Sequence, residues 1–83
     1  MGVEVGKITH YFGKIGVAAV QLSDTLKVND LIHIKGHTTD IEQKVEAMQV
    51  EHDKIEEASK GQTIGIKVID YVREHDVVYR VDS

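Results

Sequence analysis

The chain has 83 residues and a mass of 9.3 kDa, which suits one small domain because domains usually contain roughly 100–150 residues. We therefore expect a single domain over residues 1–83. Hydrophobic residues make up 41% of the chain and charged residues 29%, a balance typical of folded globular domains rather than disordered chains. The absence of cysteine excludes disulfides, thiolate nucleophiles and thiolate metal sites.

The charge and hydropathy patterns exclude further classes of protein. Ten basic and fourteen acidic residues give a net charge of −4, which argues against DNA binding and against any RNA binding driven by phosphate contacts alone. No apolar run approaches the roughly 20 residues that cross a bilayer, so we expect no membrane partner. The first residues resemble neither the basic nor the apolar part of a leader. The expected location is the cytoplasm.

Runs rich in β-branched residues predict strands at residues 3–12, 16–22 and 31–35. Glycine and small polar residues lie between these runs, as turns require. Two more runs, at residues 62–69 and 77–81, alternate apolar with polar residues and also predict strands. The short spacing between neighbouring runs is typical of hairpins.

Residues 40–60 fit two different structures. Residues at steps of four and three would share one face of a helix; these are Ile41, Val45, Met48, His52 and Ile55. The alternative is a strand over residues 43–51, with a bulge near Ala47 and Met48 that changes its apolar side, followed by a loop with one helical turn over residues 53–59. Local pattern does not decide between them.

Six segments follow one another in a distinctive order, at residues 5–8, 17–20, 26–34, 45–49, 58–66 and 72–78. The third reads Leu-Lys-Val-Asn-Asp-Leu-Ile-His-Ile, and the fifth reads Ala-Ser-Lys-Gly-Gln-Thr-Ile-Gly-Ile. Over residues 5–81 this order resembles the β-barrel that forms the second domain of translational GTPases such as elongation factor Tu. Asn29 and His75 stand where that family usually has glycine, and Asn in particular tolerates the left-handed conformation that such turns need.

The resemblance implies an all-β fold, namely a small closed six-stranded antiparallel-rich β-barrel of the translation-protein type. It also favours a strand followed by a loop over residues 40–60. Closure of a barrel removes most exposed sheet edges. The candidate core residues are Ile8, Val20, Ile32, Ile34, Val45, Ile64, Ile66, Val68 and Val81.

The chain lacks the Gly-rich phosphate loop of a GTPase, and we expect it not to be an enzyme. The resemblance implies a non-catalytic binding module that docks on a component of translation: the ribosome, tRNA or a translation-associated protein. The alternative is a structural or oligomerisation partner of a separately encoded enzyme, such as an RNA-modifying one. The oligomeric state is left open by the sequence.

Aromatic residues flanked by cations predict a binding surface, because such rings can stack on unpaired bases. Residues 7–14 contain several, and Tyr71 and Arg73 would extend the surface if the fold brings the two regions together. The candidate binding residues are Lys7, His10, Tyr11, Phe12, Lys14, Tyr71 and Arg73.

No metal, cofactor or catalytic residue is predicted. His33 and His37 have a spacing that suits a helix, but in a strand they would lie roughly 13 Å apart, too far for one ion. His52-Asp53 and His75-Asp76 are adjacent pairs, and adjacent side chains seldom face one another. Both pairs are expected in turns or loops.

Overall fold

Strands and turns make up the computed structural model, which describes residues 2–81. The strands are β1 (Gly2–Phe12), β2 (Val17–Leu22), β3 (Leu26–Lys27), β4 (Leu31–Lys35), β5 (Asp40–Lys44), β6 (Met48–Val50), β7 (Asp53–Ile55), β8 (Glu57–Ala58), β9 (Thr63–Lys67) and β10 (Val77–Val81). The five strands predicted outside residues 40–60 are confirmed as β1, β2, β4, β9 and β10.

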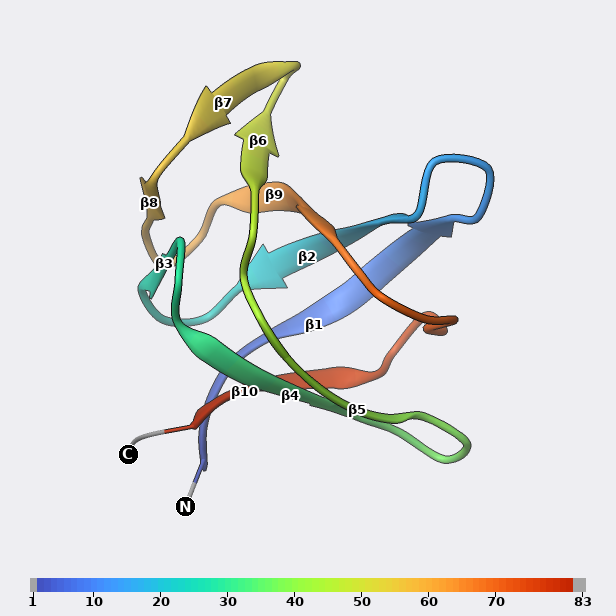
Figure 1. Ribbon diagram of the computed structural model, residues 1–83. Helices are drawn as coiled ribbons and strands as arrows, with labels where there is room; N and C mark the ends of the chain where they lie inside the picture. The colour runs from blue at the N-terminus through green and yellow to red at the C-terminus, as the bar shows by residue number, and fades with distance from the viewer. Residues whose placement is uncertain (1, 82–83) are drawn as a thin grey trace.

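The strands form one strongly curved sheet that wraps around the interior (Figure 1). Its eight strands lie in the order β5-β4-β10-β1-β2-β9-β6-β7, and each neighbouring pair is antiparallel. A separate small sheet pairs β3 with β8. The prediction of an all-β, mostly antiparallel fold is confirmed. The prediction of a closed six-stranded barrel is wrong, because the main sheet ends at β5 and β7.

A side chain replaces backbone pairing where the sheet fails to close. Gln43 of β5 donates from Nε2 to the carbonyl oxygen of Lys67 (2.8 Å), and its Oε1 accepts from the backbone N–H of Ile69 (2.9 Å). Gln43 is 7% exposed, and both bonds are partly buried. One buried amide therefore joins β5 to the chain that leaves β9, and no β5–β9 ladder exists among the described residues.

Residues 40–60 form short strands, so the helix is wrong and the strand interpretation is correct in outline. Burial alternates through Ile41, Gln43 and Val45. It then changes phase, because residues 46 and 47 are both exposed and Met48 is buried. The predicted loop with a helical turn over residues 53–59 is replaced by β7 and β8. Burial of a period-two face has overridden helix propensity here.

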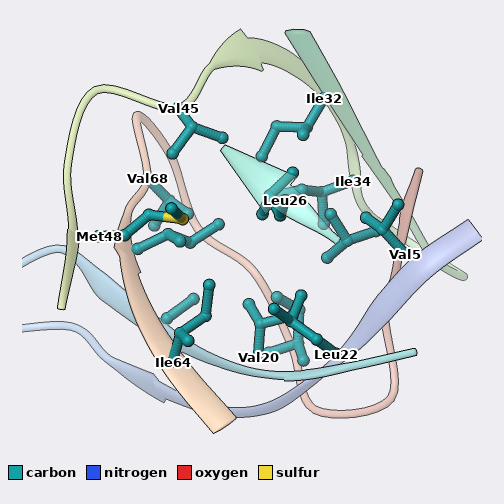
Figure 2. Close-up of a cluster of buried hydrophobic side chains, with 14 of the residues drawn as sticks. Val5, Val20, Leu22, Leu26, Ile32, Ile34, Val45, Met48, Ile64 and Val68 are labelled. Carbon is teal, nitrogen blue, oxygen red and sulfur yellow. The ribbon is translucent and has the colours of Figure 1, made fainter. Parts of the chain in front are cut away.

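The inner face of the curved sheet is filled by aliphatic side chains, as Figure 2 shows. Every predicted core residue is buried except Val81, which is half-buried where β10 pairs with Gly2. The core also contains nine residues that were not among those predicted: Val5, Ala18, Leu22, Leu26, Ile41, Met48, Ala58, Val72 and Val78.

Several turns use residues with positive φ. Asn29 and His75 have φ of 80° and 75°, which confirms that these non-glycine residues accept the left-handed conformation. Glu51 and His52, with φ of 49° and 72°, form the two-residue turn between the paired residues Val50 and Asp53. Two consecutive positive values are the pattern of a type I′ hairpin turn.

Candidate functional site

Strand β1 extends beyond its neighbour β10. Near its far end, a bulge changes which of its side chains point toward the core. Its pairing with β10 stops at Lys7, while its pairing with β2 continues to Phe12 and shifts register between Ile8 and His10. Because an extra residue changes which side chains face inward, Tyr11 packs against the core. His10 and Phe12 are left exposed.

The segment over residues 69–76 is held beside this end of β1 by buried anchors. Val72 is 1% exposed and Asp76 is 4% exposed. The Asp76 carboxylate accepts a hydrogen bond from the Arg73 backbone N–H (2.8 Å), and the His75 N–H donates to the Ile8 carbonyl oxygen (2.8 Å). With these anchors fixed, Tyr71 and Arg73 remain exposed.

An open hollow of about 500 Å³ lies between the end of β1 and this segment. We call it the tyrosine hollow; its lining residues are His10, Tyr11, Tyr71, Val72, Arg73 and Glu74. The rings of Tyr11 and Tyr71 meet at a centroid distance of 4.8 Å and an angle of 55°. His10 Nδ1 lies 3.6 Å from Glu74 Oε1. The hollow is thus walled by two aromatic rings and several polar groups.

The structure brings four of the seven candidate binding residues together: His10, Tyr11, Tyr71 and Arg73. Phe12 lies beside His10, with ring centroids 4.5 Å apart in an edge-on arrangement, but it does not line the tyrosine hollow. Lys7 lines a different hollow together with Lys60. Lys14 lies in the exposed turn between β1 and β2.

Sequence reasoning missed Val72 and Glu74 as members of the site. The buried side chain of Val72 anchors the segment, and Glu74 lies beside His10. Both belong to residues 72–78, which entered the prediction only as the last of the six segments of the family resemblance. An apolar residue, Val72, between Tyr71 and Arg73 was the signal available in the sequence.

Exposed apolar side chains gather near the same end of the molecule. Four of the five large exposed hydrophobic residues lie in the β1–β2 turn region or the segment after β9: Phe12, Ile15, Ile69 and Tyr71. A backbone hydrogen bond from Val68 N–H to the Gly16 carbonyl oxygen (2.9 Å) joins these two regions. A second, more apolar hollow of about 300 Å³ is lined by Phe12 and Ile15 together with residues of β2, β6 and β9.

Two of the described histidines, His10 and His33, each lie beside one carboxylate. His33 of β4 contacts the Asp40 carboxylate across the β4–β5 hairpin, and His37 lies in the turn. Within residues 2–81 no three metal-ligating side chains gather at one point. In the same range no serine or threonine hydroxyl is hydrogen-bonded to His10 or His33. The described part of the chain also has no helix long and apolar enough to cross a membrane.

Comparison with known proteins finds relatives among proteases. No family model matches the chain. An uncharacterised protease of Methanocaldococcus jannaschii is 40% identical over 78 residues, which are 93% of this chain and 19% of that protease. A collagenase of Porphyromonas gingivalis is 44% identical over 83 residues, which are 98% of this chain and 20% of that collagenase. The chain thus spans about a fifth of the length of these curated relatives.

A solved structure shares the fold. It is the C-terminal domain of a Geobacillus thermoleovorans protein described as a U32 peptidase, with a TM-score of 0.89 and 18% identity, covering 94% of this chain and 99% of that domain. The resemblance to translational GTPases is therefore wrong, and with it the predicted role of a translation-factor-like docking module. The short apolar and glycine patterns that suggested it are common to many β folds. The chain is similar in sequence to part of several proteases and has the fold of a U32 peptidase C-terminal domain.

Proposed function

We propose that this chain is a non-catalytic module that binds polypeptide substrate for a protease. The observation that carries the proposal is the extent of the matches. Identity of 40–45% extends over 93–98% of this chain but over only 19–22% of each relative. Most of each protease therefore lies outside the matched region. Two of the relatives are named collagenases, so we assign polypeptides as the substrate class.

The side-chain chemistry supports a binding role over a catalytic one. Hydrolysis through a covalent intermediate needs a nucleophilic side chain beside a general base. The chain has no cysteine to serve as that nucleophile. His10 and His33 each lie beside a carboxylate, and within residues 2–81 neither imidazole is hydrogen-bonded to a serine or threonine hydroxyl. Metal-assisted hydrolysis needs several converging ligands, and the described residues contain no such group. The cytoplasm remains the location expected from the sequence.

The placement of the tyrosine hollow also supports the proposal. Gly2 pairs with Val81, so the two ends of the described chain lie side by side. The β1–β2 turn and the segment over residues 69–76 project on the opposite side of the molecule (Figure 1). A protein joined through either end would leave the tyrosine hollow accessible. We propose His10, Tyr11, Tyr71 and Arg73 as its contact residues.

The test is kinetic and uses the Porphyromonas gingivalis collagenase in three forms: intact, with the matched fifth deleted, and with that fifth replaced by this chain. We call the last form the chimera. Each form is assayed on unfolded gelatin and on a short fluorogenic peptide, and this chain alone is assayed in parallel. We expect deletion to raise KM for gelatin, leaving hydrolysis of the short peptide intact, and the chimera to recover a low KM.

Two results would contradict the proposal. Cleavage of either substrate by this chain alone, after purification to homogeneity, would show that the module is catalytic. Unchanged gelatin kinetics in the deletion form would show that the matched region does not bind substrate. Circular dichroism of the deletion form and the chimera controls for loss of folding.

A further inference from the structure

The tyrosine hollow lies along an unpaired strand edge. Beyond Lys7, the backbone hydrogen bonds that β1 makes with the described chain before β10 are those of Ile8, which donates to the Asp76 carbonyl oxygen and accepts from the His75 N–H (both 2.8 Å). Residues 73–76 form a turn that leads the chain away from β1, in which the Asp76 N–H donates to the Arg73 carbonyl oxygen (3.2 Å). In the described part of the chain, residues 9–12 consequently have β2 on one side and no strand on the other.

An unpaired strand edge beside a hollow is the geometry that accepts an added strand. Main-chain hydrogen bonds give such an interaction its affinity, and pockets for alternate side chains give it specificity. Here Tyr71, which is 65% exposed, forms the wall opposite the strand edge, and its ring rests against Tyr11. An apolar side chain of the added strand could pack against this pair of rings.

The charged groups around the tyrosine hollow indicate which side chains a bound peptide should carry. Glu74 lies opposite His10, and the Asp70 carboxylate accepts a hydrogen bond from the Tyr71 N–H (2.7 Å). Arg73 is exposed, and within residues 2–81 its guanidinium makes no ion pair or hydrogen bond. It is therefore available to a carboxylate, which a guanidinium can hold through two parallel hydrogen bonds.

We propose that the tyrosine hollow binds an extended peptide segment as an additional strand along residues 9–12. One apolar side chain of the peptide packs on Tyr11 and Tyr71, and one acidic side chain pairs with Arg73. This inference rests on the proposed function and specifies its substrate: an unfolded stretch of polypeptide with an acidic residue near an aromatic or aliphatic one.

The test is fluorescence anisotropy with the whole 83-residue chain and a labelled nine-residue peptide, acetylated and amidated to remove terminal charges. The peptide alternates valine and threonine, with one phenylalanine and one aspartate. Two further peptides carry N-methyl groups on alternate amides, in the two possible phases. We expect one N-methylated peptide to lose at least tenfold in affinity and the other to bind nearly as the parent does.

Variants of the chain test the two side-chain contacts. Tyr71→Ala and Arg73→Gln should each weaken binding at least fivefold, and both positions are exposed, so folding should survive. Val3→Ala and Lys54→Gln, at exposed positions outside the tyrosine hollow, are the matched controls and should leave affinity unchanged. Replacing the peptide aspartate by asparagine should weaken binding to the unaltered chain but not to Arg73→Gln.

Several outcomes would overturn the inference: no binding of the parent peptide, equal binding of both N-methylated peptides, or equal loss of affinity in the control variants. Tighter binding of a nine-nucleotide single-stranded RNA at the same residues would also overturn it. If these tests fail while deletion still raises KM for gelatin, the module binds substrate through another surface. If deletion has no effect on gelatin kinetics, the proposed function fails instead.

Discussion

Gly36 is the position at which one added methyl group should be most disruptive. A Cβ built there would lie 1.8 Å from Asp76 Oδ1 and 2.6 Å from Asp76 Cγ, far inside van der Waals contact. Asp76 cannot move freely, because it is 4% exposed and its other carboxylate oxygen accepts the Arg73 N–H. Gly36→Ala must therefore displace the carboxylate and strain or break that hydrogen bond.

The expected loss can be estimated from these contacts. Overpacking a buried site costs about 1–3 kcal/mol, and a lost hydrogen bond to a charged acceptor adds about 1.5–3 kcal/mol. We expect Gly36→Ala to lower the free energy of unfolding by about 3–5 kcal/mol. A chain of this length has a total of about 4–12 kcal/mol, from roughly 0.05–0.15 kcal/mol per residue. The expected loss is therefore at least about a quarter of the total stability.

The assay is urea unfolding followed by far-UV circular dichroism, since the chain has no tryptophan. The variants are Gly36→Ala, Asp76→Ala and the double variant. Removing the carboxylate relieves the clash, because the nearest remaining atom, Asp76 Cβ, is 3.4 Å from the added methyl. The double variant should be more stable than the sum of the single losses by at least about 1.5 kcal/mol.

The control is Gly13→Ala, because a Cβ there meets nothing nearer than Tyr11 Cε2 at 3.4 Å. That variant should stay within about 1 kcal/mol of the unaltered chain. Additive losses in the double variant, or a loss below about 1 kcal/mol for Gly36→Ala, would refute the proposed packing of Gly36 against Asp76.

Three further changes test the Gln43 hydrogen bonds and the turns with positive φ, each by the same urea assay. Gln43→Leu should lower the free energy of unfolding by about 2–4 kcal/mol, because it leaves the Lys67 carbonyl and the Ile69 N–H without their buried partner. A loss below about 0.5 kcal/mol would show that the Gln43 hydrogen bonds are not needed for stability. Glu51→Asn combined with His52→Gly should stabilise the chain by about 1–2 kcal/mol, since both positions have positive φ, and destabilisation would contradict the assigned turn. His75→Gly should stabilise by about 1 kcal/mol for the same reason, provided that its backbone bond to Ile8 is kept; no gain would mean that the imidazole makes a compensating contact.

The strands could be predicted because their signals are local. Alternating apolar residues and turn-forming glycines fixed five strands and most of the core, including Ile8, Val20 and Ile34. That the sheet does not close could not be predicted. The hydrogen bonds of Gln43 reach Lys67 and Ile69, which lie 24 and 26 positions further along the sequence. In the sequence, nothing distinguishes Gln43 from any other polar residue of a strand with alternating burial.

The candidate site shows the same division. Four of the six residues that line the hollow were predicted from their chemistry, and the structure brings these four, His10, Tyr11, Tyr71 and Arg73, together. The bulge after Ile8 decides which of the β1 side chains face that hollow, and bulges leave little trace in sequence. The family was misjudged because short glycine and aliphatic motifs reflect the needs of turns and strands rather than descent.

The most direct test of a substrate-binding role is the kinetics of the chimera with and without Tyr71→Ala. Gelatin and the short fluorogenic peptide are compared on the same two preparations. The account predicts that the variant raises KM for gelatin at least fivefold, leaving kcat for gelatin and both constants for the short peptide unchanged. Equal KM values for gelatin in the two preparations, or a fall in kcat for the short peptide, would contradict it.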